Sequence, residues 1–502
     1  MKNYKILVIA LVALFVSSCD IEEINPNLSN ESAYKSLSDA RSSLDGLYSG
    51  LVDHSYLGSQ FYYLNCLGSG FGVTKRGGNK QDSADNSTLC SLKPPNSATY
   101  VENTWNGCYT VVARANDAIA SVKTFENPMS EDELGFNDVA GNAYFIRAFT
   151  YFNLVRFWGE IPLRLVPVTK ETIHLAKSSV DDVYAQIISD LEMAAELMSE
   201  SPRVGYPKKY AANMLLAKVY MTLAGNDNAS AYWQMAYDEA IKVYGNYTLV
   251  SDYASLFNEL AGQANSTESI FEIQSSVGAS FDHVRAFTPS WYTKASTFGW
   301  FKVNAEVYDL HNATYPGDQR ISATYISTWV QQNNQNTFSS YPSVSRSNFA
   351  KGFPFLVKLG SKNIENDIRE GNQNAIVFRY SDLLLMLAEI SNELQNGDQL
   401  GYVNEVLSRA GLFPHAGYSG DQAAFREAIM MEYQFELLME GQDWFTNRRR
   451  GYDWFLNHVI LPHNNYVDFK SNIGITLETD EATVMLVPFP ASEINANQEI
   501  SE

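Results

Sequence analysis

Apolar positions recur at helical spacing along most of the chain. Residues 38–52 place Leu44, Leu47, Tyr48 and Leu51 on one face of a helix. The same periodicity predicts further helices over residues 100–122, 180–198, 208–224, 230–245, 375–394, 400–409 and 423–440. The sequence therefore predicts a mainly α protein.

One stretch is apolar on nearly every side. Residues 143–163 read AYFIRAFTYFNLVRFWGEIPL, and seven of the fifteen residues from Tyr144 to Trp158 are aromatic. A helix of this kind belongs in the interior of a large helical protein. Gly159 and Pro162 end the helix, so we expect an extended segment over 161–168.

Residues 210–244 have the composition of a tetratricopeptide hairpin, in which small residues mark helix crossings and large rings fill the space between them. One hairpin cannot bury its apolar face alone, so neighbouring helices must stack on it. The small positions are Ala211, Ala217, Gly225, Ala236 and Ala240, and the large ones are Tyr220, Trp233 and Tyr237. We therefore expect a tetratricopeptide-like scaffold of helical hairpins.

Two regions lack helical periodicity and are expected to form long loops with a few short strands. The first is 66–98, and the second is 275–374, which holds 14 aromatic residues between Trp291 and Phe355. The segment 456–502 is also expected to be irregular. Long loops in compact proteins are often functional, although core packing beneath loops would explain many of these rings.

Aromatic side chains on loops suit carbohydrate, because sugar C–H faces stack on flat rings while amides and charged groups take the hydroxyls. The residue types in both loop regions therefore predict a ligand site. The candidate ligand contacts are Trp291, Tyr292, Trp300 and Trp329 from the second region and Phe71, Lys75, Arg76 and Asn79 from the first.

The N-terminus has the pattern of a secreted protein. Lys2 and Lys5 precede an apolar run over 6–16 that is too short to span a bilayer. The run ends in Val-Ser-Ser-Cys19, which resembles a bacterial lipobox, so Cys19 is the predicted site of lipidation. The acidic residues that follow at 20–23 resemble a cell-surface export tract, with a solvated tether as the alternative.

Three further cysteines are present, Cys66, Cys90 and Cys108. In an oxidising compartment Cys66 and Cys90 could close a loop, although the sequence leaves the connectivity open.

Charge and motifs exclude several functions. A net charge of −21 opposes non-specific binding to nucleic acid. The chain contains no HExxH, CxxC, GxSxG, P-loop or EF-hand pattern. His458 and His463 stand five residues apart, a spacing that is only a weak indication of metal ligation. We expect no enzyme activity, cofactor or metal, although a secreted glycoside hydrolase and a ligand-free scaffold remain alternatives.

Several motifs, in order along the chain, resemble the SusD/RagB-like outer-membrane nutrient-binding lipoproteins. The aromatic helix closes in the family's Gly-acid-x-Pro step. Gln434 and Thr446 to Arg448 depart from the family pattern, which puts local ion pairing in doubt. The other similar stretches are VFRYSDLLLMLAE (377–389), VNEVLSRAGL (403–412), EYQFELLMEGQDWFTNRRRG (432–451) and VPFPASEINANQEI (487–500).

The resemblance implies four tetratricopeptide-like pairs, a loop-rich ligand face and no catalysis. It implies a lipid-anchored protein on the outer surface of the outer membrane that passes glycan to a SusC-like TonB-dependent transporter. A peptide-capturing RagB-type protein is the alternative. The expected divisions are a signal peptide (1–18), a tether (19–32), a helical region (33–274), an aromatic insertion (275–374) and a C-terminal region (375–502) of the same globular body.

Charged residues within the apolar segments need partners, because an unpaired buried charge is costly. Arg147 and Arg156 lie in the aromatic helix. The motif residues Arg379, Asp382, Glu389, Arg409 and Glu440 are predicted to form buried ion pairs and caps between helices rather than ligand contacts.

Overall fold

The structure, a computed structural model, describes residues 34–74, 88–170, 172–262, 264–275, 282–348, 351–366, 373–466 and 475–500. The predicted signal peptide and the whole of the predicted tether, including Cys19, lie outside the described residues. Of the first loop, Lys75, Arg76 and Asn79 also lie outside them.

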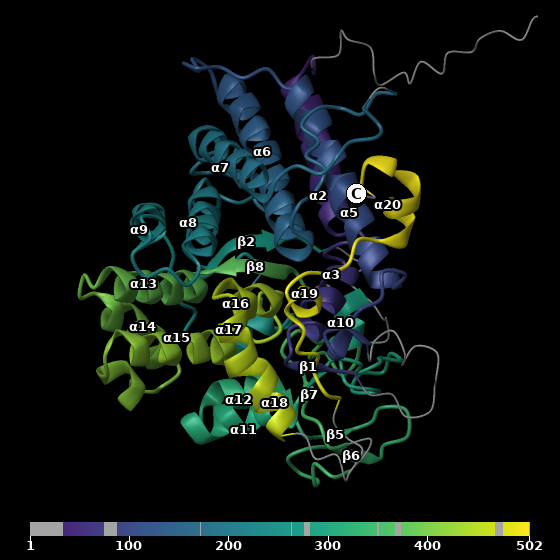
Figure 1. The fold of residues 1–502 in the computed structure, drawn as a ribbon, viewed down its shortest axis with the longest axis vertical. Coiled ribbons are helices and arrows are strands. Elements are labelled where there is room, and N and C mark those ends of the chain that lie inside the picture. The colour runs from purple at the N-terminus through teal and green to yellow at the C-terminus, as the bar shows by residue number, and fades with distance from the viewer. Residues whose placement is uncertain are drawn as a thin grey trace, which may run out of the picture.

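Helices stack one on the next through the first half of the chain (Figure 1). Five of the predicted helices are confirmed to within about two residues at each end, and the aromatic helix is longer than its apolar core. These elements are α2 (Leu37–Leu51), α5 (Thr99–Ser121), α6 (Glu131–Trp158), α7 (Val180–Leu197), α8 (Tyr210–Ala224) and α9 (Tyr232–Val243).

The aromatic helix α6 lies in the core, as its composition predicts. Ser130 caps its N-terminus by accepting a hydrogen bond from the backbone N–H of Glu133. Gly159 ends the helix at a φ of 74°, and Ile161 then continues as extended chain paired with Ser178. The helix therefore sends the chain along the body as expected.

The C-terminal half adds α13 (Tyr380–Leu394), α14 (Gln399–Arg409) and α15 (Gln422–Leu437). Helix α13 packs against α9, α14 and α15 and so joins the two halves of the scaffold. The helix predicted over 375–394 is wrong at its start, because residues 375–379 form strand β8. This strand pairs antiparallel with β2 (Ser269–Ile273), a partner about a hundred residues away that local periodicity cannot reveal.

The aromatic insertion leaves the body after β2 and returns at β8, so one strand pair fixes both of its ends. It contains three short helices that the sequence interpretation missed, since few turns give too little periodicity. Three of its strands join β1 of the first loop in a four-stranded antiparallel sheet in the order β1-β3-β7-β4, and a hairpin of β5 and β6 completes the insertion. The bounds are α10 (Asp282–Phe287), α11 (Ala305–Thr314), α12 (Gln319–Thr324), β1 (Gly72–Val73), β3 (Lys302–Val303), β4 (Tyr325–Ile326), β5 (Thr328–Val330), β6 (Thr337–Ser339) and β7 (Phe355–Leu356).

Two other segments hold more helix than expected. The described part of 66–98 follows a short helical stretch, and the segment after 456 continues in short helices instead of irregular chain. Together with short helices elsewhere in the chain, these elements are α3 (Gln60–Tyr62), η1 (Tyr63–Leu67), η2 (Tyr253–Phe257), η3 (Ala416–Ser419), α16 (Asp443–Arg449), α17 (Tyr452–Phe455), η4 (Leu456–Ile460), α18 (Leu461–Tyr466), α19 (Glu481–Val484), α20 (Ala491–Ala496) and η6 (Gln498–Ile500).

Cys66, Cys90 and Cys108 are free, buried thiols, so the suggested link between Cys66 and Cys90 is wrong. The Cys66 thiol faces the carbonyl of Met439 at 3.4 Å, while Cys108 packs within α5. Burial raises the pKa of Cys66 well above its usual range and raises that of Cys90 to about 12. These cysteines act as small core residues.

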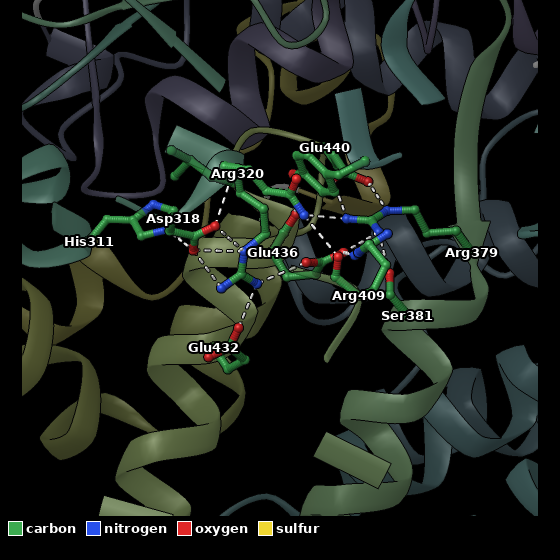
Figure 2. A network of polar contacts seen from close by, with 12 residues as sticks. His311, Asp318, Arg320, Arg379, Ser381, Arg409, Glu432, Glu436 and Glu440 are labelled. Atoms are coloured by element: carbon green, nitrogen blue, oxygen red, sulfur yellow. Dashed lines mark hydrogen bonds and ion pairs between the residues drawn. The ribbon is translucent and has the colours of Figure 1, made fainter. Parts of the chain in front are cut away.

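A buried ionic network joins the insertion to the helical body (Figure 2). The Glu436 carboxylate of α15 pairs with Arg320 of the insertion, Arg379 of β8 and Arg409 of α14. Arg379 also forms a bidentate ion pair with Glu440, in which both N–O distances are 2.8 Å. All these side chains are less than a tenth exposed.

The network reaches further into the insertion. The Lys358 ammonium pairs with Glu440 and donates to the backbone carbonyl of Glu436 at 2.8 Å. Arg320 is also held by Asp318 and by Glu432 at 2.6 Å. Burial alone would raise the pKa of Glu436, but the three arginines hold it well below its usual range.

A second network lies between α13 and α16. Glu389 accepts two hydrogen bonds of 2.7 Å from Arg449 and also pairs with Arg450. Burial would raise the pKa of Glu389, but the two guanidinium groups lower it to about 2. Together with the Lys218–Asp382 pair, these contacts confirm the prediction that the motif charges form ion pairs between helices.

We expect Glu436→Gln to lower the free energy of unfolding by about 3 to 5 kcal/mol, because it leaves buried arginines without their shared counter-charge. Urea denaturation at pH 7 measures the loss. The matched control is Glu365→Gln, which breaks an exposed pair with Lys294 and should cost below about 1 kcal/mol. Equal losses in the two variants would contradict this role of Glu436.

The free energy of unfolding should also depend on pH through Glu389. Its folded pKa of about 2 lies below the ordinary value of 4.5, so its contribution is complete above pH 4.5 and is lost as pH falls toward 2. The full contribution is about 3 kcal/mol. We expect Glu389→Gln to be less stable than the wild type at pH 7, and the difference to shrink over this window in urea titrations at successive pH values.

The buried thiols should resist labelling in the native protein, because both burial and the raised pKa suppress the thiolate. An aromatic disulfide reagent should modify Cys66, Cys90 and Cys108 only after denaturation. Ser38→Cys, at an exposed position, provides the positive control and should react at once. Rapid labelling of any of the three native cysteines would contradict the structure.

Candidate functional site

The loop over 288–300, which carries three of the predicted ligand contacts, is held by its own backbone. Trp300 N–H donates to Ala286 O at 2.8 Å, and Gly299 N–H donates to Thr288 O at 2.9 Å. Gly299 has a φ of 55°, and a Cβ there would lie 3.1 Å from the ring of Phe355. Glycine is therefore needed for the loop to close over the sheet.

Trp291 of this loop has few partners within the described part of the protein. It is half-buried and has a φ of 57°, a conformation that a bulky residue adopts only under constraint. The constraint is a 2.8 Å hydrogen bond from the backbone N–H of Gln332 to the Trp291 carbonyl. Among the described residues, its indole N–H has no acceptor and its ring has no aromatic or cationic partner. Strain of this kind often marks a functional position.

Tyr292 and Trp300 lie on the same loop and are also half-buried. Burial, followed by the charge of Glu259, raises the pKa of Tyr292, so its hydroxyl stays a neutral donor. The Trp300 ring stacks on Phe298 with centroids 4.1 Å apart and planes 6° apart. Arg285 covers the Phe298 ring at 3.6 Å.

Sequence reasoning missed Phe298 and Arg285. The spacing of Phe298 and Trp300 was a usable signal, because residues i and i+2 of an extended segment face the same side. Arg285 gave no local signal, since it comes from α10 and meets Phe298 only when the loop folds back. The backbone N–H of Phe298 donates to the Arg285 carbonyl at 3.1 Å, which fixes this approach.

Two predicted contacts are buried and act as supports in this structure. Trp329 is 5 % exposed, packs on Phe338 and Phe355, and donates its indole N–H to Ser290 O at 3.1 Å. Phe71 is 9 % exposed and belongs to the core. Rings so enclosed offer no face to a ligand, so Trp329 instead positions the residue before Trp291.

The turn of the β5–β6 hairpin forms a polar edge beside Trp291. Its residues 331–336 are all Gln or Asn, and several of their amides bond within the turn. Asn333 is exposed, and its side-chain amide has no partner in the described part of the chain. Amides at the edge of an aromatic surface are the groups that take up sugar hydroxyls.

A larger groove lies elsewhere, between the α7–α8 loop and the segment before β2. It has a volume of about 690 Å³ and is lined by Tyr206, Tyr247, Arg203 and Lys208 among others. Both rings already have neighbours, since Arg203 covers Tyr206 at 4.5 Å and Lys208 lies 5.6 Å from Tyr247. Trp291 of the aromatic loop, which has no such neighbour among the described residues, is therefore the freer ring.

The two histidines singled out by spacing have separate acidic partners. His458 pairs with Glu427 at 3.0 Å, and His463 pairs with Glu306. The described residues contain no group of three His, Cys, Asp or Glu side chains placed to hold a metal ion. Among the described helices, none is both long and apolar enough to cross a bilayer.

Comparisons with known proteins agree with this architecture. Residues 27–221 match a family described as starch-binding and associating with the outer membrane, and residues 215–502 match the SusD family. A SusD-like protein P2 of Formosa agariphila is 27 % identical over 100 % of this chain and 99 % of its own.

Solved structures show the same fold. A laminarin-binding SusD-like protein superposes with a TM-score of 0.70 at 20 % identity, covering 93 % of this chain and 98 % of its own. The surface glycan-binding protein A of Bacteroides fluxus gives 0.72 at 22 % identity, covering 91 % and 96 %. With one family model matching more than half of its length, this chain belongs to the SusD family.

Proposed function

We propose that the protein captures a glycan at the aromatic loop, with Trp291, Tyr292 and Trp300 as stacking surfaces. The observation that carries this proposal is Trp291, a half-buried residue with a strained backbone φ, whose indole N–H has no acceptor and whose ring has no aromatic or cationic partner among the described residues. A ring fixed in advance loses little entropy on binding, which favours stacking on a sugar.

The polar groups around the loop suit the same ligand. The amide-rich turn over 331–336 supplies donors and acceptors for hydroxyls, and Arg285 closes one end of the Phe298–Trp300 stack. A laminarin-binding protein and a surface glycan-binding protein share the fold, which supports carbohydrate as the ligand class. Lys75, Arg76 and Asn79 of the first loop belong to the proposed ligand face.

The remaining parts of the proposal concern location and delivery. The mature protein begins at a lipidated Cys19 and is anchored to the outer membrane at the cell surface, and the outer-membrane description of the matched family supports this. It delivers glycan to a SusC-like TonB-dependent transporter. Residues 33–274 and 375–502 form the helical body, and 275–374 supply the ligand face. The protein binds and releases its glycan unchanged, without a catalytic step.

We expect Trp291→Ala to weaken glycan binding by about 2 kcal/mol, roughly thirtyfold in Kd, because stacking area is lost at the least engaged ring. Isothermal titration of the lipid-free protein against laminarin and xyloglucan oligosaccharides measures the change. Phe413→Ala removes an 84 % exposed ring far along the chain and should leave the Kd unchanged.

Tyr247→Ala distinguishes the loop from the large groove. If this variant loses glycan binding while Trp291→Ala retains it, the ligand site is the groove and the proposed site is wrong. Binding of peptides but of none of the glycans in the panel would instead support a RagB-type peptide-capturing protein.

A further inference from the structure

Arg156 is a half-buried arginine that pairs with no carboxylate among the described residues. It lies in α6, and its guanidinium carbon is 3.6 Å from the Phe152 ring centre and 3.4 Å from that of Phe445. Its Nε donates to the Phe152 carbonyl and its Nη2 to Asn153 Oδ1, at 2.8 and 2.7 Å. Among the described residues, no carboxylate pairs with it. In a chain with a net charge of −21, a half-buried arginine without an acidic partner needs an explanation.

Its neighbour on the same helix shows the contrast. Arg147, two and a half turns earlier, donates to both carboxylate oxygens of Asp190 at 2.7 Å and also to Asn116 Oδ1. The fold therefore supplies a counter-charge at one arginine of α6, whereas the described residues supply none at the other. Burial without an ion partner lowers the pKa of Arg156 to about 9, which still leaves it charged at neutral pH.

Arg156 lines a small niche at the meeting of α6, α8, α13 and α16. Two other cations, Lys218 and Arg449, also line it, whereas Asp382 is its one acidic lining residue among those described. Lys218 pairs with Asp382, and Arg449 pairs with Glu389, which does not line the niche. The side chains that line the niche therefore carry more positive than negative charge, and Arg156 is the cation left without an acidic partner among the described residues.

The niche also presents neutral donors. Gln442, the N-cap residue of α16, and Thr446 within α16 stand one turn apart, and both are half-buried and line the niche. Neither side chain has a hydrogen-bond partner in the described part of the chain. The cavity measures about 40 Å³, roughly three times the volume of about 10–15 Å³ that one water needs. The space suits a compact ion rather than an oligosaccharide.

We propose that this niche binds a small oxyanion, a phosphate or the carboxylate of an acidic sugar. The rings of Phe152 and Phe445 cover the guanidinium of Arg156, so its free N–H groups meet a ligand at the edge, the geometry that matches two oxygens of an oxyanion. Gln442 and Thr446 then donate to the remaining oxygens. The niche uses none of the residues of the aromatic loop and stands independently of the glycan site.

The test is isothermal titration of the lipid-free protein with inorganic phosphate and with glucuronate, against sodium chloride at equal ionic strength. We expect the wild type to bind at least one oxyanion, and Arg156→Gln to bind it about tenfold more weakly or worse. Phosphate binding alone identifies free phosphate as the source, and glucuronate binding identifies a carboxylate ligand. Arg114→Gln, an exposed charge loss on α5, should leave the affinity unchanged.

Thr446→Val keeps the charge and nearly the shape of the niche, so it serves if Arg156→Gln fails to fold, and it should weaken binding several-fold. Trp291→Ala should bind the oxyanion as the wild type does, which separates this site from the glycan site. Equal binding by the wild type and Arg156→Gln, the same heat with chloride, or no binding of either oxyanion would overturn the proposal.

Discussion

The structure depends on one carboxylate shared by three arginines. Glu436 accepts ion pairs from the insertion, from the strand that ends the insertion and from the following helix, through Arg320, Arg379 and Arg409. Each partner is buried, so none can recover its hydration if Glu436 is lost. Hydrophobic packing is non-directional, whereas these directional ion pairs hold the insertion against α15 (Figure 2).

The fixed insertion explains how irregular chain can present a rigid surface. Lys358 ties its later part to the backbone of α15, and the β2–β8 pair holds both of its ends. Trp329 packs beneath the aromatic loop and bonds Ser290, while the β5–β6 turn holds the Trp291 carbonyl. Buried rings thus support exposed rings. The loop loses its conformational entropy when the protein folds, so little further entropy is lost when a ligand binds.

Much of the fold could be predicted from the sequence. Periodicity located five of the helices to within about two residues at each end, and apolar residues on every side of α6 placed it in the core. The motif charges were predicted to form interhelical pairs, and Arg379–Glu440 and Lys218–Asp382 do so. Short helices such as α11 escaped detection because few turns give little periodic signal, and β8 was taken for helix because its strand partner lies far away in the chain.

The sequence by itself determined the helical class, the family motifs and the concentration of rings in one insertion, since these depend on local spacing and residue type. It could not separate the rings that face a ligand from those that support them: Trp291 and Trp329 look alike as letters, and only the tertiary structure buries one and strains the other. Nor could it show that Arg147 would meet Asp190 while Arg156 would meet no acid among the described residues. Exposure and charge pairing are set by contacts between distant segments, which only the folded chain decides.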